Sequence, residues 1–255
     1  MERLNLVTRL GNDILLNGGE IFRANEAMEY AAKALLLEGF NAYVIANGIF
    51  STAVIDGRFY SSRICYVPLA PTMLCRVDAL NHLSRRIASG ECGPYEMRSE
   101  LERIERMETA GNRAKIVASG FGSASFCYLF KGSFFDSAMA FAAGVILYIF
   151  LLYAAPRISV SRIINNILAS GLVALFCCFA YGAGLGDNLD RMMIGAIFPM
   201  VPGIPLTNSI RNFLENDYLS GLIRMVDAFL TAGCIAIGVG MAMRLWMTMT
   251  GGTIG

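Results

Sequence analysis

The sequence predicts an α-helical polytopic membrane protein of about five transmembrane spans that begins with a soluble α+β domain. Of its 255 residues, 55% are hydrophobic and only 16% are charged, and the mean hydropathy is +0.52. A typical soluble domain has roughly 25% charged residues. The charges are also uneven, because 28 of the 41 Lys, Arg, Asp and Glu residues fall within residues 1–115. We therefore expect a cytoplasmic α+β domain at 1–115 and a transmembrane helical domain at 116–255.

Four helices are predicted in the soluble domain. Apolar residues recur at three- and four-residue spacing from Leu4 to Leu16, and Gly18-Gly19 ends this first helix. A second helix is predicted from about Arg23 to Glu38, with Gly39 at its end. Two further helices follow the strands, at 73–88 and at 95–108, and the second of these is strongly charged.

Three strands are predicted between these helix pairs. Residues 41–47, 49–55 and 58–67 are rich in β-branched and aromatic residues. Asn47-Gly48 and Asp56-Gly57 separate them, and both dipeptides favour tight type I′ turns. This pattern predicts a three-stranded antiparallel meander in a domain with the order ααβββαα.

Five apolar stretches follow, at about 116–130, 134–155, 163–185, 192–207 and 221–246. The first and fourth are shorter than the roughly 20 residues that cross a bilayer core. Basic residues near the span ends number five on one side of the membrane and three on the other, which favours a cytoplasmic N-terminal domain. They are Arg113, Lys115, Arg157, Arg162 and Arg211 on one side, and Lys131, Arg191 and Arg244 on the other. The expected location of the protein is the plasma (inner) membrane.

Small residues in these stretches are spaced for close helix packing. Ala228, Ala232, Ala236 and Gly240 form a four-residue ladder in the last stretch, and Ala140 with Gly144 forms another in the second. The spacing leaves open whether the helices pack within this chain, against a partner or in a homo-oligomer.

Neither a nucleic-acid partner nor a metal, cofactor or catalytic site is expected. The net charge is only +1, and the seven cysteines show no CxxC or metal-ligand spacing, so we interpret them as reduced, structural thiols. The one histidine, His82, lies in a helix with polar neighbours, where it is expected to face solvent. The amino end also lacks the pattern of a cleaved signal peptide.

The most informative segment is 198–212, where Pro202 and Gly203 interrupt an apolar stretch together with two further prolines. Proline removes a backbone donor and clashes with the preceding turn, so the helix must break there. Broken helices at membrane depth commonly form the substrate sites of transporters, although a kinked packing helix or an interfacial loop has the same pattern. Asn208, just past the break, either offers its amide to a carboxylate or caps the next helix.

Two pairs of charged residues are spaced one helical turn apart. Arg224 and Asp227 lie in the last apolar stretch, where ionisable residues are costly and usually functional. Alternatively, Arg224 extends to the lipid headgroups and Asp227 complements the helix N-terminus. Arg23 and Glu26 follow Gly19 in the soluble domain, and a surface ion pair explains their spacing equally well.

Three segments together resemble the threonine/serine exporter family: GGEIFRANEA, LFKGSFFD and VPGIPLTNSIRNFLENDYLSGLIRMVDA. The resemblance covers nearly the whole chain and is greatest to short members that supply only the N-terminal half of an exporter. Lys131 departs from the pattern, because the family has a glycine in this turn. The resemblance implies motif positions at Gly19, Arg23, Glu26, Pro202, Gly203, Asn208, Gly221, Arg224 and Asp227.

The resemblance further implies a membrane exporter of small carboxylates, either a succinate-like dicarboxylate or threonine and serine. A smaller separate membrane protein would supply the missing half. Arg224 would balance the charge of the substrate, and Asp227 would relay a proton or ion, because a carboxyl group in an apolar setting can change its protonation. Two other classes stay open, a membrane-anchored enzyme and a regulatory subunit whose soluble domain senses a metabolite.

Overall fold

The structure is a computed structural model that describes residues 2–55, 57–61, 65–68, 72–108, 110–158 and 160–251. It divides into two compact units. The first unit comprises Met1–Thr109 together with Thr207–Arg224, and the second comprises Ala110–Leu206 together with Met225–Gly255. The chain therefore leaves the first unit near residue 109 and returns to it for 207–224.

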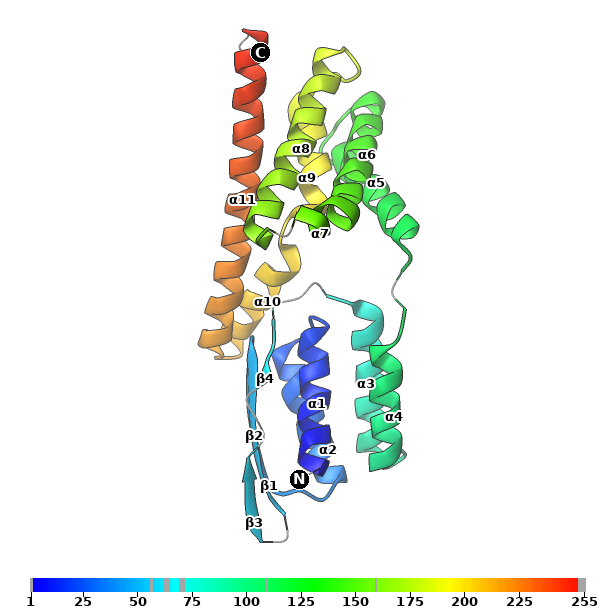
Figure 1. The fold of residues 1–255 in the computed structure, drawn as a ribbon, viewed down its shortest axis with the longest axis vertical. Helices are drawn as coiled ribbons and strands as arrows, with labels where there is room; N and C mark the ends of the chain where they lie inside the picture. The colour runs from blue at the N-terminus through cyan, green and yellow to red at the C-terminus, as the bar shows by residue number, and fades with distance from the viewer. Residues whose placement is uncertain are drawn as a thin grey trace. The chain divides into compact units, whose positions relative to one another are not determined.

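The first unit is built in layers (Figure 1). A small sheet forms the first layer, and α1 (Glu2–Leu16) and α2 (Ile21–Ala34) pack on one of its faces. The helices α3 (Leu74–Ala88) and α4 (Pro94–Glu105) form a third layer against α1 and α2. Fully buried apolar side chains from all three layers form one core, including Leu10, Met28, Ile49, Leu80 and Leu101. The helices predicted at 4–16, 73–88 and 95–108 are thus confirmed to within a few residues.

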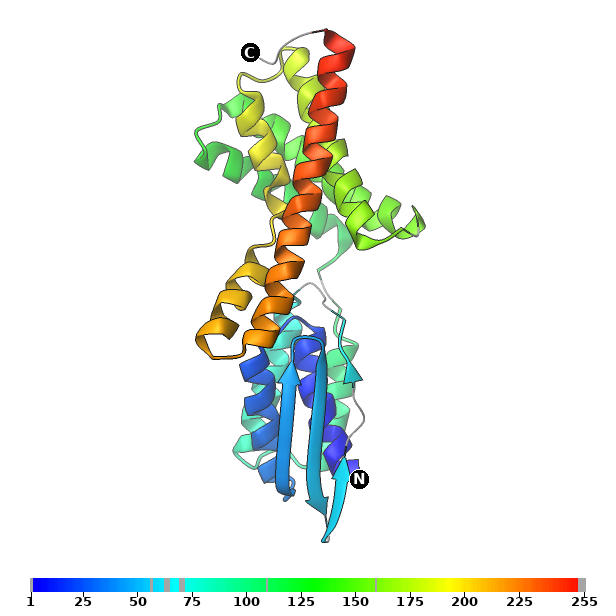
Figure 2. The ribbon, with the colours of Figure 1, turned by 90° about the vertical axis from the view of Figure 1, so that its left-hand side faces the viewer.

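The predicted antiparallel meander is confirmed, with one change in its third strand. β1 (Glu38–Ile45) pairs with β2 (Gly48–Ile55), which pairs in turn with β3 (Arg58–Ser61), as Figure 2 shows. The short β4 (Cys65–Tyr66), predicted as part of the third strand, pairs separately with Gly48 and Ile49 in a register shifted by one residue. Gly57 has a φ of +71°, as a tight turn requires, and Asp56 lies outside the described residues.

The predicted end of the second helix is wrong, because α2 ends at Ala34 and not near Glu38. Leu36 takes a left-handed φ of 55°, and the N–H of Leu37 donates to the carbonyl of Ala32 at 2.9 Å. This is the geometry of a helix C-cap at which glycine is usual. A leucine occupies the position here, so the glycine signal at Gly39 misplaced the end of the helix.

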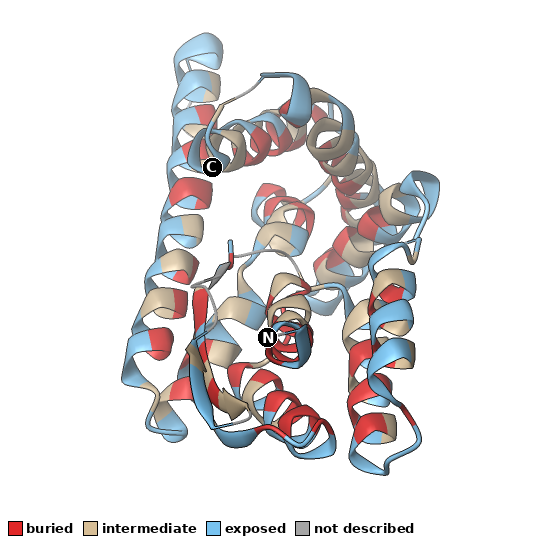
Figure 3. Ribbon diagram, turned by 60° about the horizontal axis from the view of Figure 1, so that its bottom comes forward, coloured by how far each residue is buried: buried red, intermediate tan, exposed pale blue. Residues whose placement is uncertain are grey.

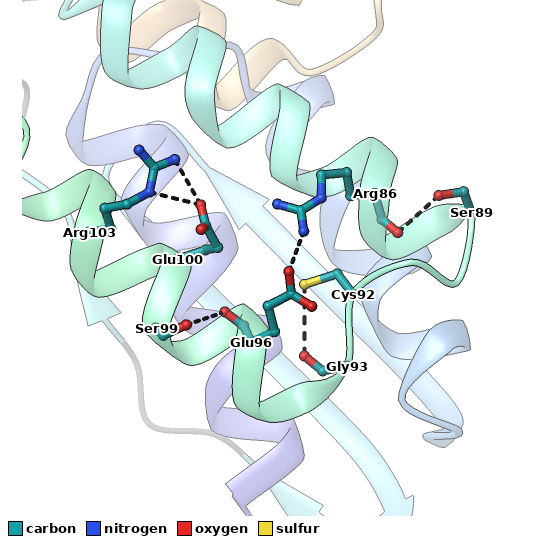
Figure 4. Close-up of polar contacts among 8 residues, drawn as sticks. All are labelled: Arg86, Ser89, Cys92, Gly93, Glu96, Ser99, Glu100 and Arg103. Atoms are coloured by element: carbon teal, nitrogen blue, oxygen red, sulfur yellow. Dashed lines mark hydrogen bonds and ion pairs between the residues drawn. The ribbon is translucent and has the colours of Figure 1, made fainter.

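The turn between α3 and α4 is held by polar contacts (Figure 4). Arg86 of α3 forms an ion pair with Glu96 of α4, and Arg103 pairs with Glu100 along α4. Cys92 is buried beside the first pair, and burial raises the pKa of its thiol above the ordinary value. The Cys92 thiol is therefore protonated at neutral pH, which fits a structural role.

Residues 207–224 contribute a helical hairpin to the first unit. It consists of the later part of α10 (Gly203–Leu214) and the first two turns of α11 (Tyr218–Thr250). The hydroxyl of Ser209 donates to the carbonyl of Gly221 at 2.8 Å, and Asp217 accepts the N–H of Ser220 at 3.2 Å. A Cβ at Gly221 would lie 2.7 Å from the ring of Phe213, so this close packing requires glycine.

The second unit contains the apolar helices. They are α5 (Asn112–Leu129), α6 (Phe134–Ile149) with its extensions η1 (Phe150–Ala154) and α7 (Ala155–Ile158), α8 (Arg162–Gly182), α9 (Leu189–Ile197) and the rest of α11. Three are long and apolar enough to cross a membrane, at Phe134–Ile158, Arg162–Gly182 and Tyr218–Thr250. The bent pair Leu189–Met200 and Gly203–Leu214 raises the number to four if it forms one span. The predicted total of five spans would also require α5 to cross the membrane, so this total stays a prediction.

Glycines let α5, α6 and α9 approach closely. A Cβ on Gly144 would overlap the Ser123 hydroxyl, and one on Gly195 would lie 2.5 Å from Cys127 Cβ. The close contact predicted at Ala140 and Gly144 is thereby confirmed. The predicted ladder on α11 behaves differently, because only Ala228 is buried and Ala232, Ala236 and Gly240 are exposed.

The contact between α11 and α8 is made instead at Gly238, where a side chain would overlap Ser170. Exposed positions run along much of α11 in Figure 3. Only 22% of its most apolar window is buried within the chain. A helix this apolar and this exposed needs lipid or another protein to cover it.

Candidate functional site

The turn between α1 and α2 carries the first predicted motif. Gly18 has a φ of +75°, which favours glycine, and a Cβ on Gly19 would lie 2.6 Å from the Ile14 side chain. The Gly19 N–H donates to the Ile14 carbonyl at 2.9 Å. Both glycines are therefore required by the backbone, and they place the Gly19 carbonyl at the edge of the turn.

Arg224 reaches this turn from the start of α11. Its Nη2 donates to the carbonyl of Gly19 at 3.5 Å, and the residue is only 8% exposed. Two predicted motif positions, 205 residues apart in sequence, are thus brought together within the first unit. An arginine buried against a backbone carbonyl holds the helical hairpin on the turn.

Charged side chains extend this contact around Glu20. Its carboxylate pairs with Arg211 of α10, and Arg23 lies 3.9 Å from its second oxygen. Arg23 also pairs with Glu26 at 3.5 Å, as their spacing predicted. The predicted Arg23 and Glu26 therefore belong to a partly exposed ion-pair network, in which Glu20 and Arg211 were missed by sequence reasoning.

A further contact joins the hairpin to the sheet. The N–H of Ala46, at the end of β1, donates to the hydroxyl of Ser220 at 3.1 Å. Ser220 is fully buried. Nothing in the sequence pattern indicated this residue, because a serine next to a glycine is equally typical of a turn.

The predicted break in this apolar segment is confirmed. η2 (Phe198–Met200) follows α9, Val201 is extended, and α10 starts at Gly203, so the two parts are bent by 60°. Asn208 is half-buried inside α10 and therefore does not cap that helix. Pro202 lies at the bend, where its missing N–H leaves no helical hydrogen bond to break.

A shallow cavity of about 440 Å³ lies between this break and α11. Val201 and Pro202 line it on one side, and the exposed small residues Ala232, Ala236 and Gly240 line it on the other. Apolar side chains alone give no partner to a carboxylate. Any recognition of a charged group in the second unit therefore needs ionisable side chains close to this region.

Asp227 supplies such a group, and its partner is Arg162 at the start of α8. Arg162 Nη2 lies 2.7 Å and 2.8 Å from the two carboxylate oxygens and 3.4 Å from the Thr231 hydroxyl. Asp227 and Thr231 are one turn apart on α11, and the cavity lining begins at the next residue, Ala232. Sequence reasoning had assigned Arg162 only to a span end, so the structure adds it to the site.

Asp136 is a fully buried carboxylate in this unit, and its role is structural. It closes a capping box with Ser133 at the start of α6. It also accepts the backbone N–H groups of Asp187 and Asn188 at 2.7 Å and 3.0 Å. These bonds fix the loop between α8 and α9 and leave little capacity for another partner.

No group of three His, Cys, Asp or Glu that could hold a metal ion occurs in the part of the chain that the structure describes. His82 is exposed. Apolar helices, a helix pair broken at a sharp bend and an ion pair between two of the apolar helices are together features of membrane transporters. The fold and site thus define a multi-pass membrane protein of the transporter class.

Comparisons with known proteins identify the family. A family model described as "Putative threonine/serine exporter" matches residues 5–246, and the chain belongs to this threonine/serine exporter family. The family is one of transporters and not of enzymes. An uncharacterized protein of Schizosaccharomyces pombe is 24% identical over an alignment of 256 positions, which covers 97% of this chain. The chain spans about a third, 34%, of that relative's length. No solved structure matches this chain.

Proposed function

We propose that this chain is the membrane subunit of a two-component exporter of small carboxylate metabolites, either threonine and serine or a succinate-like dicarboxylate. A smaller separate membrane protein supplies the second half. Residues 1–115 form most of a cytoplasmic domain, which the hairpin of residues 207–224 joins, and the transmembrane domain in the plasma (inner) membrane lies within the rest of residues 116–255. The family match supports export of threonine and serine, and the division into two proteins rests on the resemblance to short members of this family.

The observation that carries this proposal is the ion pair between Arg162 and Asp227. Both residues belong to helices that are long and apolar enough to span a membrane. Charges in such helices are costly and usually serve ion or substrate pathways. Asp227 is 23% exposed and Arg162 is 54% exposed, so the arginine can be reached without unfolding the helix.

The pair gives a simple mechanism of exchange. A substrate carboxylate that binds Arg162 displaces Asp227, and the released Asp227 takes up a proton. When the substrate leaves, Asp227 loses its proton and pairs with Arg162 again. Substrate and proton thereby bind together and leave together, so the pair couples movement of the substrate to movement of a proton in the same direction.

The other predicted residues support this site in different ways. Pro202 and Gly203 form the break, Asn208 follows it in α10, and Arg224 fixes the hairpin on the Gly19 turn. Arg162 replaces Arg224 as the proposed counter-charge of the substrate, because Arg162 is the residue whose guanidinium contacts Asp227.

Efflux from cells loaded with labelled threonine or succinate tests the mechanism. Replacing Asp227 with Asn should lower export at least about tenfold, equivalent to about 1.4 kcal/mol in the barrier, while the protein stays in the membrane. Arg162→Gln should have the same effect, because either change removes the exchange. Asp190→Asn is the matched control, since Asp190 is an exposed carboxylate at the start of α9.

A charge swap separates transport from stability. If the pair only stabilises the fold, the double variant Arg162→Asp with Asp227→Arg should restore both protein level and export. The exchange mechanism predicts restored protein level without export. Export at the full rate by Asp227→Asn would show that this carboxylate relays no proton.

A further inference from the structure

A cavity of about 200 Å³ in the first unit is not used by the proposed transport mechanism. Three helix ends enclose it: the end of α1, the start of α3 and the end of α4. Its lining includes Asp13, Asn17, Met73, Arg76, Ile104 and Glu105. Pockets for drug-sized ligands start at about 300 Å³, so this cavity suits a smaller molecule.

Arg76 gives the cavity an unused donor for an anion. Its Nη2 donates to the carbonyl of Met107 at 2.9 Å, which fixes the guanidinium. Its Nε is buried, and it has no hydrogen-bond partner among the residues that the structure describes. A buried charged donor without an acceptor is unfavourable, so the protein compensates this guanidinium incompletely, and a carboxylate held against the part of Arg76 that lines the cavity would be stabilised.

Asp13 and Glu105 give the same cavity two acceptors for a cation. They share one guanidinium, that of Arg9, whose Nη2 lies 2.9 Å from Glu105 and whose Nε lies 3.7 Å from Asp13. Burial raises the pKa of Asp13 to about 6, although Arg9 acts in the opposite direction. The charge of Asp13 is thus only partly compensated, and a second cation beside it would be favoured.

We propose that this cavity binds a small zwitterionic amino acid such as threonine or serine, with its α-carboxylate on Arg76 and its α-ammonium beside Asp13 and Glu105. Two carboxylates and the guanidinium groups of Arg9 and Arg76 balance in charge, so a neutral zwitterion keeps that balance. A dicarboxylate such as succinate would bring further negative charge to Asp13 and Glu105. The site belongs to the first unit and does not rest on the transport mechanism.

The cavity shares its wall with the turn that Arg224 contacts. The Met73 N–H donates to the Asn17 carbonyl at 2.9 Å, and the Thr72 hydroxyl donates to the Gly18 carbonyl at 3.4 Å. The amide of Asn17 donates to the Asp13 carbonyl at 2.7 Å. A ligand bound here stabilises the Gly18-Gly19 turn through these residues, so the site is suited to regulation by the cellular amino acid.

Calorimetric titration of the purified full-length protein with L-threonine tests the site. Arg76→Met should weaken binding roughly tenfold to a hundredfold, the loss of a charge-assisted hydrogen bond. Arg103→Met is the matched control, because Arg103 is an exposed arginine on α4 that pairs with Glu100 (Figure 4). Asp227→Asn should leave threonine binding at this site unchanged. The unfolding temperature of each variant shows whether it is folded.

Ligand analogues keep the test decisive even if Arg76→Met does not fold. Succinate lacks the ammonium group and threoninol lacks the carboxylate, so each should bind the Asp227→Asn protein, which lacks the transport ion pair, at least about tenfold more weakly than threonine. The proposal is overturned if this protein binds no threonine, or if succinate binds to it as tightly. It is also overturned if Asp227→Asn abolishes threonine binding while Arg76→Met retains it. Threonine binding without any efflux would uphold this site and contradict the exporter proposal alone.

Discussion

Asp13 is a residue whose pKa is affected more by burial than by its ion pair with Arg9. Its side chain is 18% exposed on α1, between Arg9 and Glu105. Burial raises its pKa from 3.8 to about 6, Glu105 acts in the same direction, and Arg9 opposes both. The folded chain therefore binds a proton at Asp13 more tightly than the unfolded chain does.

This shift predicts how stability depends on pH. Because the pKa of Asp13 is higher in the folded chain, its protonation contributes to the free energy of unfolding. This contribution is fully present below about pH 3.8 and is lost as the pH rises through about 6. The loss is at most roughly 3 kcal/mol. Between pH 4.5 and 7.5 the unfolding temperature of wild-type protein in detergent should therefore fall relative to that of Asp13→Asn. Asp78→Asn, at an exposed site on α3, should follow the wild type, and parallel curves for wild type and Asp13→Asn would refute the shift.

The residues of the candidate site could be partly predicted, but their partners could not. A spacing of three residues shows that Arg224 and Asp227 share a helix face, and an apolar context shows that both need partners. The partners are Gly19 and Arg162, which lie 205 and 65 residues away in the chain. Only the tertiary fold determines such pairs. The Arg23–Glu26 pair was predictable because both residues lie on one helix.

At the scale of elements, α10 has to be considered with α9. Nine residues of α9 and three of η2 give about 18 Å at 1.5 Å per residue, less than the roughly 30 Å of a bilayer core. The later part of α10 belongs to the first unit, where Arg211 pairs with Glu20 and Ser209 bonds to Gly221. We therefore expect α10 to lie on the same side of the membrane as the rest of that unit.

Cysteine labelling tests this placement. Leu214 is 79% exposed at the end of α10, and Glu91 is exposed in the turn before α4. In a background with Cys65 and Cys75 replaced by serine, Leu214→Cys and Glu91→Cys should both react with a membrane-impermeant thiol reagent from the cytoplasmic side. Reaction of the two positions from opposite sides would show that α10 ends across the membrane from the soluble part.

Local sequence patterns predicted most elements. They failed where the structure depends on a register shift, an unusual residue at a helix end or a packing contact between distant helices. The meander followed from β-branched runs and Gly turns, whereas the separate β4 depends on a one-residue shift that no pattern shows. Leu36 replaces the glycine expected at the end of α2. On α11 the repeat of small residues indicated the wrong face for packing within the chain, because Gly238 and not Gly240 contacts α8.

At the scale of the whole molecule, the chain passes from the first unit into the second, back into the first and out again. Composition predicted a soluble part and a membrane part, because charge density changes sharply near residue 115. It could not predict that residues 207–224 join the first unit, since that segment lies between two predicted spans and about 100 residues after that unit in the sequence. This return places the start of α11 in the first unit and the Arg162–Asp227 pair in the second, along one continuous helix.

The most direct test of the exporter account is the efflux of labelled threonine and of labelled succinate from preloaded cells that lack their own exporters. The chain is expressed alone and together with a small membrane protein that supplies the second half of the family fold. The account predicts faster efflux than in control cells only when both proteins are present, and the label that leaves faster identifies the substrate class. Efflux of neither label above the control, with both proteins in the membrane, would contradict it.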